Sequence, residues 1–284
     1  MPGERIGALG HLRGGARGRA ECDDEPVSTA ARWSTSIDYV EEYATAANRF
    51  AAAVAGADMH ARVPSCPAWS AYDLAVHLGN VHAWAATIVE TASRAAEQND
   101  APRSARAKPV SRWYAGKAED LCQVLRHARL DQPCWNFAFG TGVVGFWPRR
   151  QLHETTIHQV DLDLAARRPT DLAAELSADG IDEVLTVFLH RMHTRGHPAD
   201  LVGPIALTAT DTGDAWTVAP QPAGRPPTVE QVGTVGSGVR DHVAAPADVL
   251  YRLLWKRAPA DDPALEVTGD RARVLAFLGS RLVP

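Results

Sequence analysis

The sequence predicts an α+β protein in which an N-terminal four-helix bundle is followed by a small α+β domain. Three observations lead to this fold class. Apolar residues recur at helical spacing in four segments before about residue 170. Beyond that point, short runs of alternating apolar and polar residues, typical of strands, lie between further helical segments. The chain of 284 residues is also long enough for two modest domains that each bury a core.

This pattern divides the chain into three parts. Residues 1–34 are rich in glycine, arginine and acidic residues and show no periodicity, so we expect a disordered tail. Residues 35–170 are predicted to form the helical bundle, and residues 171–284 the α+β domain.

The first two helices have recognisable ends. An apolar stripe predicts a helix over residues 37–54, and Gly56 ends it. Ser70 is a good N-cap for a second helix over residues 71–96, and Asp73 three positions later completes a capping box.

The third helix is predicted over residues 115–128, after a polar loop at 101–109. The connection to the fourth helix, residues 135–147, is aromatic and glycine-rich, with two tryptophans, three phenylalanines and three glycines.

The fourth helix carries the pair that most suggests chemistry. Pro148 and Pro169 bracket the segment, and Glu154 and His158 are four residues apart, so they share one helix face. A carboxylate and an imidazole so placed can bind one divalent metal, and a solvated or hydrogen-bonded helix face is the alternative. The run is not the His-Glu-x-x-His motif of metalloproteases, because His153 and His158 are five residues apart. Glu154 would therefore be a ligand and not a base.

A third donor, His77, lies on the second helix. If the second and fourth helices are neighbours, His77, Glu154 and His158 make a His₂Glu set, which in catalytic zinc sites leaves one position for water or substrate. The alternative is that His77 is a hydrogen-bonded core residue. Asp161 either orients a ligand imidazole or forms a surface ion pair. We expect Trp69 to belong to the core.

Beyond residue 170 the sequence predicts a mixture of helices and short strands. The turn at 211–214 joins two alternating segments and indicates a β-hairpin. The expected elements are a helix at 172–190, strands from 205 and 216, a strand at 229–238, a helix at 247–256, a strand at 265–267 and a helix at 270–278.

Composition excludes several classes of protein. The formal charge of −5 and a pI near 6.1 argue against a nucleic-acid binder. No apolar run approaches the roughly 20 residues of a membrane span. The four cysteines are scattered without a Cys-x-x-Cys pair, so we expect reduced thiols in a cytoplasmic protein.

Three segments resemble one family. Residues 63–79, from Val-Pro-Ser-Cys-Pro-Ala-Trp to His77-Leu-Gly, are similar to the N-terminal signature of the mycothiol-dependent maleylpyruvate isomerases, whose bundle is DinB-like. The run Arg-Arg-x-x-His-Glu-Thr-x-x-His-x-x-Asp at 149–161 resembles the second signature of that family. Residues 246–257 and 267–270 are similar to its sterol-carrier-like C-terminal domain.

The resemblance implies a metal- and mycothiol-dependent enzyme. It implies that His77, Glu154 and His158 hold a divalent metal, typically zinc, and that mycothiol is the thiol co-substrate. A metal-bound thiolate would add to, or be transferred onto, a small electrophilic substrate in an isomerase or S-transferase. The alternative is a non-catalytic DinB-like protein that binds metal and a partner. We expect a monomer or homodimer.

The family also uses an arginine of the C-terminal domain to bind its anionic substrate. Arg257 matches that position best, and Arg240 is the competing candidate. Lys256 stands where the family motif usually has glycine, so the backbone before Arg257 departs from the pattern.

Overall fold

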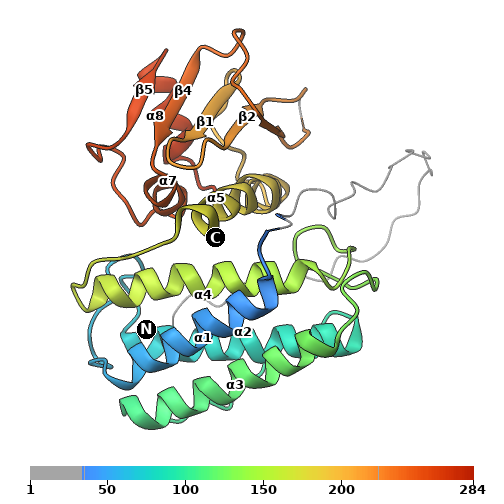
Figure 1. Cartoon of the computed structure of the whole chain (residues 1–284), viewed down its shortest axis with the longest axis vertical. Coiled ribbons are helices and arrows are strands. Elements are labelled where there is room, and N and C mark those ends of the chain that lie inside the picture. The colour runs from blue at the N-terminus through green and yellow to red at the C-terminus, as the bar shows by residue number, and fades with distance from the viewer. Residues whose placement is uncertain (1–33, 35, 223) are drawn as a thin grey trace. The chain divides into compact units, whose positions relative to one another are not determined.

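The computed structural model describes residue 34, residues 36–222 and residues 224–284. The tail predicted for residues 1–34 therefore lies, except for Ser34, outside the described residues. Four helices follow one another in the first part of the chain (Figure 1): α1 (Tyr39–Ala55), α2 (Ala71–Thr91), α3 (Ala107–His127) and α4 (Phe146–Ala165). Helix α3 packs against both α1 and α2, and α4 packs against the same two helices.

The start of α2 is as predicted. The Ser70 side chain accepts from the Asp73 N–H, and the Asp73 carboxylate accepts from the Ser70 N–H at 2.8 Å, which is a complete capping box. The helix ends at Thr91, about one turn before the predicted end, because Ala92 adopts a left-handed conformation with φ 54°.

The third helix begins earlier than the sequence indicated. It starts at Ala107, and the predicted polar loop at 101–109 is therefore wrong over its last three residues. Pro109 is the third residue of α3, a position where a missing N–H breaks no helical hydrogen bond.

The second part of the chain mixes helices and strands. Its elements are α5 (Ala174–Glu183), the π-helical turn η2 (Val184–Phe188), α6 (Leu189–Thr194), β1 (Ile205–Ala209), β2 (Ala215–Ala219), β3 (Thr228–Val232), β4 (Asp241–Ala245), α7 (Ala247–Leu254), β5 (Glu266–Thr268) and α8 (Arg271–Gly279). The strands form one sheet of order β3-β2-β1-β4-β5. Only the β1–β4 pairing is parallel among the described strands, with Ile205 opposite Asp241.

The α+β fold class is confirmed. The one strand that was not predicted is β4, which lies between β1 and β5. Its residues are buried on both sides, except for the half-buried His242, so its sequence lacks the alternation that marks a strand. Its two alanines also have low strand propensity. The domain boundary near residue 170 stays a prediction.

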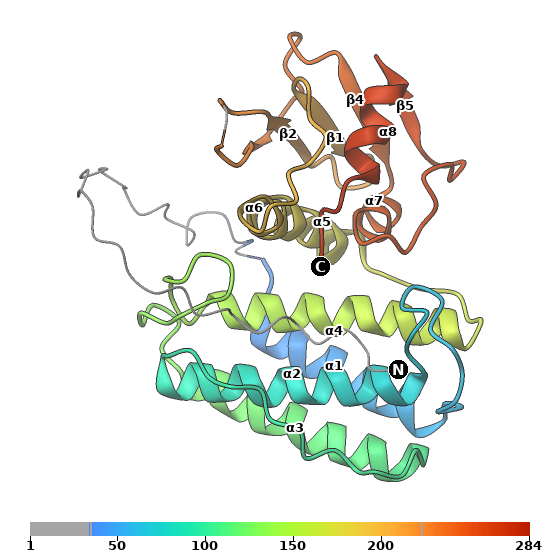
Figure 2. The same ribbon diagram turned by 180° about the vertical axis from the view of Figure 1, so that it is seen from behind.

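Helix α4 is the most deeply buried element. All its residues are buried except Glu154, Leu164 and Ala165. On one side it packs on α1 and α2, and α5 and α7 lie on the other side, between α4 and the sheet (Figures 1 and 2). No helix among the described residues is long and apolar enough to cross a membrane.

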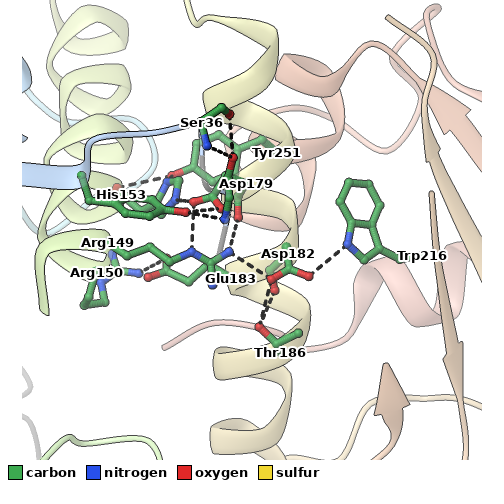
Figure 3. Close-up of polar contacts among 12 residues, drawn as sticks. Ser36, Arg149, Arg150, His153, Asp179, Asp182, Glu183, Thr186, Trp216 and Tyr251 are labelled. Atoms are coloured by element: carbon green, nitrogen blue, oxygen red, sulfur yellow. Dashed lines mark hydrogen bonds and ion pairs between the residues drawn. The ribbon is translucent and has the colours of Figure 1, made fainter. Parts of the chain in front are cut away.

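The buried polar side chains of α4 keep hydrogen-bond and ion-pair partners, because α5 supplies them (Figure 3). The Arg149 guanidinium donates to Asp179 Oδ2 at 2.9 Å and to Asp182 Oδ2 at 3.0 Å. His153 Nε2 lies 2.6 Å from Asp179 Oδ2, and Arg150 pairs with Glu183. These ion pairs join the bundle to the second part of the chain.

Candidate metal centre

Three side chains that the sequence singled out converge at the surface between α2 and α4. One ligand atom each of His77, Glu154 and His158 lies within 4.8 Å of the others. Glu154 Oε1 is 3.3 Å from Nε2 of His77 and 3.3 Å from Nε2 of His158. The two imidazole rings are 5.2 Å apart and nearly perpendicular, so both nitrogens point at the same oxygen.

The helices explain this convergence. Glu154 and His158 are one turn apart on α4, as their spacing predicted. His77 lies on α2, which packs against α4. Glu154 is the one residue in the first eighteen of α4 that is not buried, and its side chain is 16% exposed. The site is therefore reachable from solvent in a helix that is otherwise covered.

Arg150 fixes the orientation of the Glu154 carboxylate. Its NH2 donates to Glu154 Oε2 at 2.7 Å, one helical turn away, which leaves Oε1 for the histidines. Burial raises the pKa of Glu154, but the charge of Arg150 and the hydrogen bonds from His158 and His77 outweigh it and hold the pKa well below its usual range. Glu154 is thus an anion at neutral pH.

Asp161 orients His158. Its Oδ2 is 2.8 Å from His158 Nδ1, which leaves Nε2 facing Glu154. Asp161 is fully buried, so the choice left open by the sequence resolves in favour of a hydrogen bond to the imidazole. Burial opposes ionisation of Asp161, but hydrogen bonds from His158 and Arg257 lower its pKa far below the usual range. Ser65 also donates to this carboxylate.

The two candidate arginines lie in different places. Arg257 donates from Nε and NH2 to Asp161, at 2.9 Å each, and from NH1 to the Trp255 carbonyl at 2.6 Å. Arg257 is therefore linked to the three converging side chains indirectly, because Asp161, its partner, also hydrogen-bonds His158. Arg240 is exposed just before β4 and, within the described residues, makes no hydrogen bond or ion pair with the three converging side chains.

Trp69 belongs to the site more than to the core. It is only half-buried, and its ring lies 4.7 Å from that of His77 and 6.3 Å from that of His158. The sequence-based expectation that Trp69 belongs to the core did not include this contact with the two histidine rings. Its place in the loop just before the Ser70 N-cap was the available signal. The imidazole of His153, in contrast, contacts Asp179 and the hydroxyl of Tyr251 (Figure 3).

The donor set suits a divalent metal. Two imidazole nitrogens and one carboxylate oxygen face a common point, and each is held by a partner on its far side or by helix packing. Three protein ligands of this kind are typical of zinc sites that leave one position open for water or substrate. Hydrogen-bonded carboxylates behind ligand histidines are equally typical.

Comparison with known protein families identifies two domains in this chain. Residues 40–163 match the sequence model of the mycothiol maleylpyruvate isomerase (MDMPI) N-terminal domain, and residues 175–276 match that of the MDMPI C-terminal domain. No curated protein matches the sequence closely enough to count as a relative.

Two crystal structures of mycothiol-dependent maleylpyruvate isomerase have a similar fold. One is 12% identical with a TM-score of 0.53, and the match covers 80% of this chain and 92% of that chain. The other, a variant with one histidine replaced by alanine, is 10% identical with a TM-score of 0.51, covering 76% of this chain and 86% of that chain. The two matched domains, in order and over most of the sequence, show that this chain belongs to the mycothiol-dependent maleylpyruvate isomerase family.

Proposed function

We propose that this protein is a metal- and mycothiol-dependent enzyme that activates the thiol for addition to, or transfer onto, a small electrophilic and anionic substrate. The observation that carries the proposal is the convergence of His77, Glu154 and His158 on one point. These residues would hold a divalent metal, for which zinc is the best candidate. When bound, such a metal makes a coordinated thiol lose its proton near neutral pH.

The surrounding residues prepare the three donors. Arg150 donates a hydrogen bond to Oε2 of Glu154, so Oε1 would serve as a single-oxygen ligand to the metal. Asp161 accepts a hydrogen bond from Nδ1 of His158, which would leave the lone pair of Nε2 for a bound metal. Arg257 holds Asp161 in place with two hydrogen bonds. Trp69 closes one side of the site against the rings of the histidines.

The protein's own thiols are poor candidates for the nucleophile. Cys66 lies near the centre, with Sγ 3.7 Å from the NH2 of Arg257. Burial, followed by the negative charge of Asp161, raises the pKa of its thiol, so Cys66 stays protonated at neutral pH. This supports a sulfur nucleophile from a co-substrate. Free Cys122 and Cys134 suit a reducing cytoplasm, the location we propose.

The metal proposal is tested by the metal content of purified variants. The wild type is expected to retain one zinc per chain after dialysis, and His158→Ala and Glu154→Gln are expected to lose it. Glu154→Gln keeps the shape of the side chain beside Arg150, so its fold should persist. The exposed His60→Ala is the matched control and should keep the metal. Unchanged zinc in His158→Ala would overturn the assignment.

The thiol proposal is tested separately with the zinc-loaded protein. Mycothiol is expected to raise the melting temperature, and maleylpyruvate with mycothiol is expected to isomerise from the cis to the trans form. Cys66→Ser should retain this activity. A protein that binds zinc but neither binds mycothiol nor turns over maleylpyruvate or other electrophiles would instead be a non-catalytic metal-binding member of the family.

A further inference from the structure

Arg191, on α6, is a partly buried arginine without an acidic partner. Its NH1 donates to the carbonyl oxygen of Phe137 at 3.2 Å, and its guanidinium carbon lies 4.3 Å from the centre of the Phe137 ring. Its Nε is buried and has no hydrogen-bond partner. Among the residues the structure describes, no carboxylate lies at ion-pair distance from it.

Three other inward-facing arginines in the described part of the chain each have a carboxylate partner. Arg149 pairs with Asp179 and Asp182, Arg150 with Glu154 and Glu183, and Arg257 with Asp161. A buried donor without an acceptor and a charge without a counter-ion both cost free energy. In a protein that pairs its buried charges so consistently, the exception points to an anion that comes from outside the chain.

The position of Arg191 connects it to the candidate metal centre. The Phe137 ring lies 6.0 Å from that of Phe188, and the Arg150 guanidinium carbon lies 4.8 Å from the Phe188 ring. Arg150 in turn binds Glu154. Two aromatic rings therefore separate Arg191 from the arginine that orients the metal ligand.

The electrostatics agree with this proximity. Burial, with the positive charges of Arg195 and Arg150, lowers the pKa of Arg191 to about 10, and the charge of Glu154 acts in the opposite direction. Arg191 therefore stays charged at neutral pH and contributes to a positive field beside Glu154, which attracts anions.

A second unpaired donor lies in the same aromatic cluster. Trp255 Nε1 is buried without a partner, and the Trp255 ring is 5.0 Å from that of Phe188. The aromatic, glycine-rich connection before α4 supplies Phe137 to this cluster. It provides both the ring and the carbonyl group that hold the guanidinium in place.

We propose that Arg191 binds a carboxylate group of the substrate. This inference rests on the proposed function, because it assigns the anionic end of the substrate to a cation that two aromatic rings separate from Arg150, the partner of Glu154. A guanidinium held by a ring and one carbonyl still has Nε and NH2 free, and these two donors match the two oxygens of a carboxylate.

The test measures binding of maleate, a cis-dicarboxylate, by isothermal titration calorimetry. Arg191→Met is expected to weaken maleate binding at least tenfold. Arg191→Lys is expected to weaken it less, because the ammonium keeps the positive charge, although it cannot form the two-pronged contact. Arg195→Met, an exposed arginine one turn away, is the matched control and should stay within twofold of wild type. The neutral dimethyl ester should not distinguish Arg191→Met from wild type.

Stability separates a binding role from a structural one. If Arg191 serves a ligand, Arg191→Met should melt at or above the wild-type temperature, because it removes an uncompensated charge. In the turnover assay KM should rise much more than kcat falls. Wild-type maleate affinity in folded Arg191→Met, or no saturable maleate binding by the wild type, would overturn the proposal.

Titrations of metal-free protein keep this result apart from the metal assignment. In one outcome Glu154→Gln loses zinc and maleate binds Arg191→Met more weakly than wild type. In another, Glu154→Gln retains zinc and maleate still binds Arg191→Met more weakly. The first outcome supports both inferences, whereas zinc that persists in Glu154→Gln contradicts only the metal site.

Discussion

Lys256 occupies a position that normally favours glycine. It is the first residue beyond the Trp255 cap of α7, and its φ of 62° is left-handed. Its N–H donates to the Leu253 carbonyl at 2.9 Å, and the Arg257 N–H donates to the Arg252 carbonyl at 2.6 Å. This pair of bonds is a Schellman motif, and it turns the chain so that Arg257 reaches Asp161. The glycine in the family motif therefore reflects a backbone requirement that this chain meets with a lysine.

Two variants at this position isolate the backbone strain. Lys256→Gly and Lys256→Ala both remove the amine that donates to the Leu278 carbonyl, but only glycine is free of the left-handed penalty. We expect Lys256→Gly to be more stable than Lys256→Ala by about 1 kcal/mol in urea unfolding. Equal stability of the two variants would contradict the strain.

The residues of the site differ in how far the sequence reveals them. Glu154 and His158 are one turn apart on one helix, so local spacing was enough to pair them. The approach of His77, and the contact of Asp161 with Arg257, depend on packing between distant segments, which periodicity does not contain. Arg191 gave no signal, because its significance lies in a missing partner that only the folded chain shows.

At the scale of elements, His82 joins the four helices of the bundle. It lies on α2 and is fully buried. Its Nδ1 is 2.7 Å from Gln151 of α4, its Nε2 is 3.1 Å from the hydroxyl of Tyr114 of α3, and its ring packs edge-on against Tyr43 of α1. One neutral imidazole thus satisfies polar groups on two neighbouring helices in the middle of an apolar core.

This histidine makes the stability of the bundle depend on pH. Burial lowers the pKa of His82 from 6.5 to about 4. Between these pH values His82 is protonated in the unfolded chain but neutral in the folded chain. The free energy of unfolding therefore falls as the pH falls. From about pH 7 to about pH 5 the expected loss from this group is about 2 kcal/mol.

The variant His82→Gln should show a flatter pH profile, although it is less stable than the wild type at neutral pH. Urea unfolding at several pH values measures this slope. The exposed His60→Gln is the matched control and should keep the wild-type profile. A wild-type slope in His82→Gln would assign the pH dependence to other groups.

Elements with local signals were predicted best. The capping box at Ser70 placed the start of α2 to the residue, since the bonds involved join neighbours in the sequence. Strand β4 has no such local signal. It is recognised only through its pairing with β1 and β5, which are distant along the chain. The start of α3 was missed because residues 101–109 were interpreted as a polar loop, although the first turn of a helix tolerates Pro109.

At the scale of the molecule, α4 belongs to both parts of the chain. Its buried charges are paired with α5, and Trp216 of β2 donates to Asp182 at 3.1 Å within the same network (Figure 3). Separating the two parts would expose these pairs or leave buried charges without partners, and a single broken buried pair costs about 3–5 kcal/mol. The bundle and the sheet are therefore expected to unfold together.

Native-state hydrogen exchange tests this coupling. The slowest amides of α4 and of β1 should report one common free energy of unfolding. If zinc binds at Glu154, a zinc concentration of 100 times Kd should raise that free energy by about 2.7 kcal/mol at both places, because a ligand stabilises everything that unfolds with its site. Glu154→Gln should abolish the zinc effect at both. If zinc raised the protection of α4 but not of β1, the two parts would be separate cooperative units. The ion pairs between α4 and α5 would then break before either unit unfolds.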